Sequence, residues 1–142
     1  MNNADRDLIA KSFGGPFPLA VGTSALAAEL STQILQAGPG EICLSFVVGD
    51  RFTQATGVLQ GGAVASMLDF GLAFAALTLR GPGESAVTLS LAINYLRPAL
   101  PGSYEVHAKV IRAGRRLTFV EASLLGPAGD AVATASSPLL NS

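Results

Sequence analysis

The chain has 142 residues, of which 49% are hydrophobic and 13% are charged, and its formal net charge is −1. This length predicts one domain with a buried core, and the near-zero charge argues against binding to nucleic acid or to an anionic membrane. A surface this poor in charge favours an oligomer that hides apolar area between its subunits.

The cysteine content and the N-terminal segment bear on the compartment. Cys43 is the one cysteine, so the chain cannot form an internal disulfide and lacks the paired cysteines of many zinc sites. Residues 1–13 lack the basic-then-apolar order of a secretory signal. We therefore expect a cytoplasmic protein.

The first third of the chain predicts a short helix followed by a β-hairpin. Residues 3–12 have the pattern of a short amphipathic helix. Periodicity leaves 26–36 ambiguous between helix and strand, but the turn at 38–40 (GPG) favours the first strand of a hairpin. Residues 41–48 alternate apolar and other side chains, which is typical of the partner strand.

The segment 61–80 (GGAVASMLDFGLAFAALTLR) predicts a long helix, because it is rich in alanine and leucine and contains no proline. Such a helix is apolar on all sides and is normally enclosed by protein, where a carboxylate is costly unless it is hydrogen-bonded. Asp69 is therefore the first candidate functional residue. A structural carboxylate and a solvated acid at a frayed end remain alternatives, whereas the acid and the glycines disfavour a membrane span.

The rest of the chain predicts a polar loop at 50–59 and four strands after the helix, at 86–96, 104–112, 117–125 and 131–137. We expect an α+β fold in which a curled antiparallel sheet of about five to six strands wraps one long helix. The expected domain is 1–142, with a lead-in at 1–25 and a core at 26–138. Because one sheet covers one side of a helix, a second subunit is expected on the other side.

The sequence lacks the residues that catalytic triads, metal sites and phosphate-binding loops require. His107 is the one histidine, and its neighbours Glu105 and Lys109 indicate a position on the sheet surface rather than in a catalytic triad. The sequence shows no cluster of three metal ligands and no phosphate-binding glycine loop. We therefore expect neither a metal nor a cofactor.

The start of the long helix offers hydrogen-bond donors. Gly61 and Gly62 leave backbone N–H groups free at the positive end of the helix dipole, where a polarised carbonyl oxygen can bind. Gln60 precedes them and can donate from its side-chain amide. Asp69 follows Gly61 by eight residues, about 12 Å along the axis. The acid and the helix start can therefore act on one carbonyl only if they come from different subunits.

Three runs of residues carry a resemblance to a known family. The runs GVLQGGAVASMLDFGLAFAA, LAINYLRPALPG and AKVIRAGRRLTFVEASLLGPAGDAVATA resemble the hotdog-fold thioesterases of the PaaI-like, phenylacetate-degradation group in the 4-hydroxybenzoyl-CoA thioesterase superfamily. The resemblance covers about residues 26–137. It implies a hotdog fold, two subunits paired edge to edge with active sites at their interface, a homodimer or homotetramer, and an acyl-CoA substrate.

The resemblance also implies roles for individual residues. Gln60 stands where the family pattern has a histidine, Gly61 where a backbone N–H polarises the thioester carbonyl, and Asp69 at the catalytic carboxylate. Gln54 replaces a frequent asparagine, and Thr88 matches a serine or threonine that assists the water or the carboxylate. The two glutamines depart from the pattern and bear on rate and substrate range.

The leading hypothesis is an acyl-CoA thioesterase that hydrolyses a small or medium acyl group, aryl groups included. Asp69 would act as general base or as nucleophile. The acyl group would lie near Phe70 and Leu72, whereas Arg115 and Arg116 either contact the phosphates of coenzyme A or form a solvated hairpin tip. The alternative is a non-catalytic module that binds or senses acyl-CoA on the same fold. A hotdog dehydratase is disfavoured, because one histidine is available.

Overall fold

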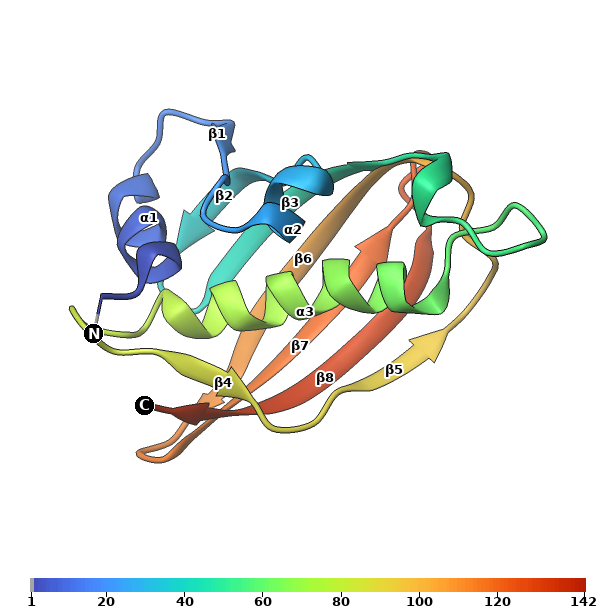
Figure 1. Ribbon diagram of the computed structural model, residues 1–142. Coiled ribbons are helices and arrows are strands. Elements are labelled where there is room, and N and C mark those ends of the chain that lie inside the picture. Colours follow the sequence, from blue (N-terminus) through green and yellow to red (C-terminus); the bar gives the residue numbers. More distant parts are fainter. Residues whose placement is uncertain (1) are drawn as a thin grey trace.

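A computed structural model describes residues 2–142 and contains one long helix, α3 (Gly61–Leu77), held in the curve of an antiparallel sheet (Figure 1). The strands are β1 (Leu19–Ala20), β2 (Gln33–Gly38), β3 (Glu41–Val48), β4 (Ala86–Thr88), β5 (Ala92–Tyr95), β6 (Gly102–Ala113), β7 (Leu117–Leu125) and β8 (Ala131–Asn141). Their order is β1-β2-β3-β6-β7-β8-β4, and β5 also pairs with β8. The predicted α+β architecture is confirmed.

The sheet curls because its long strands are interrupted by bulges. The register shifts between Ile34 and Gln36 in β2, between Val110 and Arg112 in β6, and between Ala131 and Ala133 in β8, opposite Leu124 and Leu125. A bulge bends its strand and increases the local twist. The curled sheet can therefore follow part of the circumference of α3.

Over residues 2–142 the sheet has eight strands rather than the predicted five to six. One addition is the short β1, and the other arises because the predicted strand 86–96 divides into β4 and β5. Val87 and Leu89 are about half exposed, at 50% and 54%, whereas Leu91 and Ile93 pack against the core. Odd-numbered residues thus face outward before residue 90 and inward after it. Because side chains alternate strictly along a regular strand, one unbroken strand cannot contain both halves.

The prediction of a strand over 26–36 is wrong for its first half. Residues Ala25–Glu29 form a short helix, α2, whose first turn is capped by Ser24 Oγ accepting from Ala27 N–H at 3.2 Å. A serine cap followed by alanine and leucine favours this helical turn. The strand begins only at Gln33.

The N-terminal helix is confirmed as α1 (Ala4–Ser12), with Asn3 Oδ1 accepting from Arg6 N–H at 3.1 Å as its cap. Its Ile9 is fully buried in the core. Among the described residues, no helix combines the length and the apolar character that crossing a membrane requires.

One face of α3 packs closely on the sheet, and the other stays partly open. Gly71 lies against β6, where a Cβ would stand 2.3 Å from Val106 Cγ1. Met67 and Leu68 on the same helix are fully buried. Across the helix, Asp69 and Phe70 remain partly exposed. The enclosure predicted for the whole helix is therefore incomplete in a single chain.

Candidate functional site

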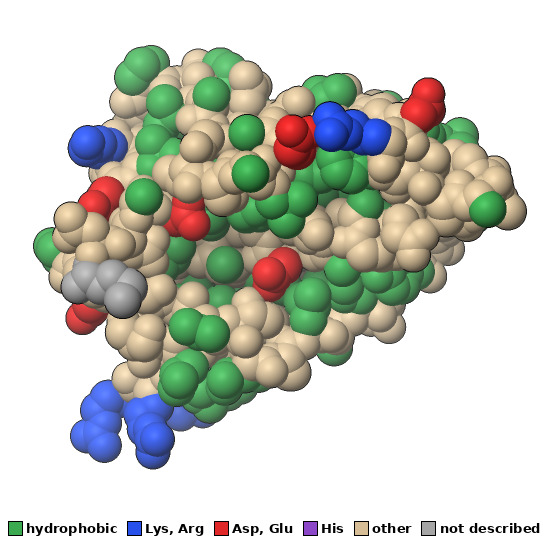
Figure 2. All heavy atoms as spheres, viewed as in Figure 1, with side chains coloured by type: hydrophobic (Ala, Val, Ile, Leu, Met, Phe, Trp, Pro, Cys, Tyr) green, Lys and Arg blue, Asp and Glu red, His purple; other side chains and the backbone are tan. Residues whose placement is uncertain are grey.

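Asp69 lies in the middle of α3 and points toward β4, which follows the helix. Thr88 Oγ1 donates a hydrogen bond of 2.8 Å to Asp69 Oδ1. Figure 2, viewed as Figure 1, shows an isolated acidic side chain over the middle of α3 among hydrophobic and uncharged groups. Within residues 2–142, no basic side chain forms an ion pair with this carboxylate.

This arrangement leaves part of the carboxylate free to react. In the described chain no protein group donates to Asp69 Oδ2, and the side chain is only partly buried. A carboxylate that is oriented by one hydroxyl and keeps a free oxygen can accept a proton from water or attack an electrophilic carbon. The two residues that the sequence analysis assigned to this chemistry, Asp69 and Thr88, are therefore in contact.

The start of α3 presents two unpaired donors. In the part of the chain that the structure describes, the N–H groups of Gly61 and Gly62 have no protein acceptor. Gln60 precedes them with an extended backbone (φ −59°, ψ 140°), and its side chain is exposed and does not cap the helix. These N–H groups lie at the positive end of the helix dipole and can stabilise an oxyanion.

Tyr95 fixes this helix start and was missed by the sequence analysis. Its hydroxyl donates a 2.8 Å hydrogen bond to the carbonyl oxygen of Gly61, joining β5 to α3. The two residues are 34 positions apart, and the contact depends on how β5 pairs with β8. No local pattern in the sequence indicates it.

Two clefts flank the helix start. One, of about 350 Å³, is lined by residues that include Gln60, Gly62 and Ser66. The other, of about 440 Å³, lies on the opposite side and includes Gly61 and Tyr95. Both donors are therefore reachable from a hollow of the surface, which is the setting that a bound ligand requires.

Within one protomer the acid and the helix start remain separate. They belong to the same helix, and eight residues at 1.5 Å each place them about 12 Å apart. No loop in the described chain bends Asp69 toward Gly61, because α3 is continuous from Gly61 to Leu77. A carbonyl that meets both groups would have to lie between two chains.

The other predicted substrate contacts near α3 differ in position. Phe70 is partly exposed and packs edge-on against Phe74, with ring centroids 5.7 Å apart. Leu72 is fully buried in the core, which argues against its predicted substrate contact. Gln54 instead stabilises its own loop, since its Oε1 accepts from Thr56 N–H at 2.7 Å and from Thr56 Oγ1 at 2.8 Å.

Arg115 and Arg116 lie at the exposed tip of the β6–β7 hairpin, beside β4 and the end of β8. Figures 1 and 2 place this tip near the C-terminal end of α3, with Lys and Arg side chains gathered there. Gly61 is at the other end of the helix. The structure therefore does not bring these arginines to the helix start of their own chain.

Comparison with known proteins gives a family match. The model of the thioesterase superfamily matches residues 56–129, a little over half of the chain. The matched segment includes the whole of α3, with Gly61 and Asp69, and continues through β7.

Individual relatives agree with this match. A Saccharolobus solfataricus protein named as an esterase is 36% identical over 80 residues, covering 56% of this chain and 53% of that protein. Human acyl-coenzyme A thioesterase 13 is 29% identical over 96 residues, covering 67% of this chain and 68% of its own. The chain thus spans about half to two thirds of the length of these curated relatives.

A solved structure supports the fold over nearly the full length. A phenylacetic acid degradation-related protein from Ralstonia eutropha JMP134 superposes with a TM-score of 0.81 and 28% sequence identity. The match covers 97% of this chain and 99% of that one. The curled sheet around one long helix is therefore the hotdog fold.

Proposed function

The chain belongs to the thioesterase superfamily, and from this membership we propose that it hydrolyses acyl-CoA thioesters carrying a small or medium acyl group, aryl groups included. The name of the human relative, an acyl-coenzyme A thioesterase, supports the coenzyme A ester as substrate. The Ralstonia protein, named for phenylacetic acid degradation, supports the inclusion of aryl groups.

The observation that carries the proposal is the pair formed by Asp69 and Thr88. A carboxylate on a largely apolar helix is costly unless it is hydrogen-bonded or in contact with solvent. Within the described residues Asp69 has one protein donor, Thr88 Oγ1 at 2.8 Å, and it lies on the open face of α3. This arrangement suits a group that must meet a water molecule or a substrate.

The proposed active site is composite, with Asp69 from one subunit and the helix start from another. The N–H of Gly61 would donate to the thioester carbonyl oxygen, with Gly62 and the Gln60 amide beside it. The negative charge that develops on this oxygen would be stabilised by the donors and by the helix dipole. A two-fold axis that brings one such pair together also creates a second, equivalent site.

Asp69 would then act in one of two ways. As a general base it takes a proton from water, whose oxygen attacks the carbonyl carbon, and the coenzyme A thiolate leaves and is protonated. As a nucleophile it attacks the carbon itself, forming a mixed anhydride that water hydrolyses to the acid. In both cases Thr88 orients the carboxylate. The acyl group would lie along Phe70, and Arg115 and Arg116 are the proposed contacts to coenzyme A phosphates.

The test measures thiol release from a panel of acyl-CoA esters with a thiol-specific reagent. We expect turnover by the native chain and a loss of at least about 100-fold in kcat for Asp69→Asn, the scale of an acid–base group. Asp50→Asn is the matched control, because Asp50 is exposed in the short 3-10 turn Asp50–Phe52. Its rate should equal that of the native protein.

A second variant removes the proposed oxyanion donor. Gly61→Pro deletes the N–H at the first helical position, where proline is tolerated, and the extended Gln60 backbone suits a residue before proline. We expect a fall in kcat of about 10²–10³. Tight acyl-CoA binding without thiol release by the native chain would instead favour the binding or sensing module, and full activity of Asp69→Asn would refute the proposed chemistry.

A further inference from the structure

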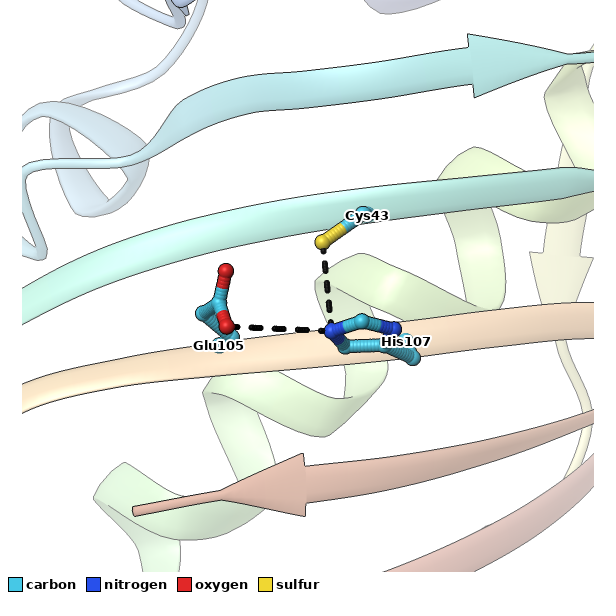
Figure 3. A group of neighbouring side chains, drawn as sticks. All are labelled: Cys43, Glu105 and His107. Atoms are coloured by element: carbon cyan, nitrogen blue, oxygen red, sulfur yellow. Dashed lines mark hydrogen bonds and ion pairs between the residues drawn. The ribbon is translucent and has the colours of Figure 1, made fainter. Parts of the chain in front are cut away.

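A second group of reactive side chains lies on the opposite side of the sheet. Cys43 on β3 and Glu105 and His107 on β6 converge there (Figure 3). Cys43 Sγ lies 3.4 Å from His107 Nε2, and the same nitrogen lies 3.8 Å from Glu105 Oε2. The three ligand atoms lie within 4.8 Å of one another.

Strand register creates this cluster. Cys43 is directly opposite His107 in the β3–β6 ladder, and Glu105 precedes His107 by two residues, so all three occupy the same face. The alternate positions Leu44 and Val106 are fully buried on the inner face. Cys43 and His107 are 64 residues apart, so the sequence predicts no group of three metal ligands, and the structure corrects this expectation.

The spacing of the three atoms is close to that of a metal site. Tetrahedral Zn²⁺ has bonds of about 2.3 Å to sulfur and about 2.0–2.2 Å to nitrogen and oxygen, so neighbouring ligand atoms lie roughly 3.4–3.6 Å apart. The two separations from His107 Nε2, 3.4 Å and 3.8 Å, differ from this range by at most a few tenths of an ångström. The third pair, Cys43 Sγ and a Glu105 carboxylate oxygen, lies within 4.8 Å, so these two atoms must approach each other by up to about 1.2 Å. Glu105 and His107 have side chains that are about half exposed, so they can make these shifts.

We propose that Cys43, Glu105 and His107 bind one divalent cation of the Zn²⁺ class. Sulfur and imidazole ligands select borderline-soft ions such as Zn²⁺ and Co²⁺ over Mg²⁺ or Ca²⁺. On binding, the Cys43 thiol gives up its proton to solvent and its sulfur bonds the metal. His107 binds as the neutral imidazole through Nε2, with its proton on Nδ1. Together with the Glu105 carboxylate, the site is electrically neutral and leaves a fourth position for water.

The surroundings of the cluster are compatible with a cation. Lys109 follows His107 by two residues on β6 and therefore lies on the same outer face of the sheet. It is opposite Glu41 on β3 and Glu121 on β7. These two carboxylates offset its charge. A hollow of about 320 Å³, lined in part by Cys43 and His107, borders the cluster and gives the ion access.

The proposed metal site is separate from the proposed thioester site. Helix α3, which carries Asp69, packs on the inner face of the sheet through Gly71 against Val106 and Ala108. Cys43 and His107 lie on the outer face, so the sheet stands between them and the helix. Metal binding therefore requires neither Asp69 nor the start of α3.

The experiment titrates the full chain, purified without a polyhistidine tag, with ZnCl₂ by calorimetry. We expect one Zn²⁺ per chain, and at least about tenfold weaker binding in Cys43→Ser and in His107→Gln, since loss of a ligand costs no less than loss of a group that only orients one. Asp50→Asn is the control, because it removes an exposed carboxylate that lies outside the cluster and is not opposite Lys109 in either strand ladder. Its affinity should be unchanged, as should that of Asp69→Asn.

A spectroscopic measurement keeps the proposal decidable if a variant folds poorly. Co²⁺ added to the native chain should produce the charge-transfer absorption of a thiolate–cobalt bond, which Zn²⁺ then abolishes by displacement. The absence of this band, the absence of Zn²⁺ binding, or equal affinity of the native chain and a folded Cys43→Ser variant would each overturn the proposal. None of these outcomes depends on thioester hydrolysis.

Discussion

At the scale of single residues, Asp69 is notable because it accepts few hydrogen bonds for a carboxylate on an apolar helix. A structural carboxylate in an apolar helix would be expected to have several donors, because each unmet hydrogen bond of a buried acid is costly. Asp69 has one donor in the described chain, Thr88 Oγ1. Partial exposure on the open face of α3 makes this tolerable. The site therefore tolerates a carboxylate that one hydrogen bond orients and whose other oxygen has no protein donor in the described chain.

Replacing Thr88 tests whether this orientation matters for catalysis. Thr88→Val keeps the shape but removes the hydroxyl, and a hydrogen bond to a charged group is worth about 1.5–3 kcal/mol. If that bond is strongest in the transition state, kcat for the best acyl-CoA substrate should fall by about 10–100-fold with KM little changed. Thr88→Ser, which restores the hydroxyl, should recover most of the rate. Equal losses in the serine and valine variants would mean that Thr88 acts through packing alone.

At the scale of elements, α3 depends on one close approach to the sheet. An ideal Cβ on Gly71 would lie 2.3 Å from Val106 Cγ1 and 3.5 Å from Ala108 Cβ. Glycine at this position lets the helix sit directly on β6, and the neighbouring side chains of both elements are buried as a result.

Gly71→Ala should therefore destabilise the protein even though alanine is the better helix former. Helix propensity alone favours alanine by about 1 kcal/mol. Overpacking against β6 typically costs about 1–3 kcal/mol, so we expect a net loss in the free energy of unfolding measured by urea denaturation. Gly62→Ala is the control on the same helix, because none of the neighbours that the structure describes lies within 4 Å of its added Cβ. A Gly71→Ala variant as stable as the Gly62→Ala variant would contradict the packing argument.

Elements that local patterns define are predictable from the sequence. The helix α3, the hairpin strands β6 and β7, and the contact between Asp69 and Thr88 all follow from periodicity, turn residues or the family pattern. Features that depend on long-range strand pairing are not predictable in this way. The change of facing between β4 and β5, the Tyr95 contact to Gly61 and the Cys43–His107 cluster each depend on which strands become neighbours.

At the scale of the whole molecule, one edge of the sheet exposes apolar side chains and has no partner strand in the described chain. Val87, Leu89, Tyr95 and Leu96 lie along β4, β5 and the residues beside them, and each is at least half exposed. In the described chain β4 and β5 pair only with β8, so their outer edge has no partner strand. An exposed apolar edge of this kind is normally paired or covered. We propose that a second copy of the chain pairs with it, which would place one subunit's Asp69 near the other's helix start.

Mixing two inactive variants tests this composite site directly. Asp69→Asn removes the acid and Gly61→Pro removes the donor, so each homodimer should be inactive. After the two chains are unfolded and refolded together, random pairing makes about half of the dimers mixed, and each mixed dimer has one fully native site of two. We therefore expect about a quarter of the native acyl-CoA hydrolysis rate from the mixture, and almost none from either variant refolded alone. If both groups served the same site within one chain, every site in the mixture would carry one of the two substitutions, and no activity would return.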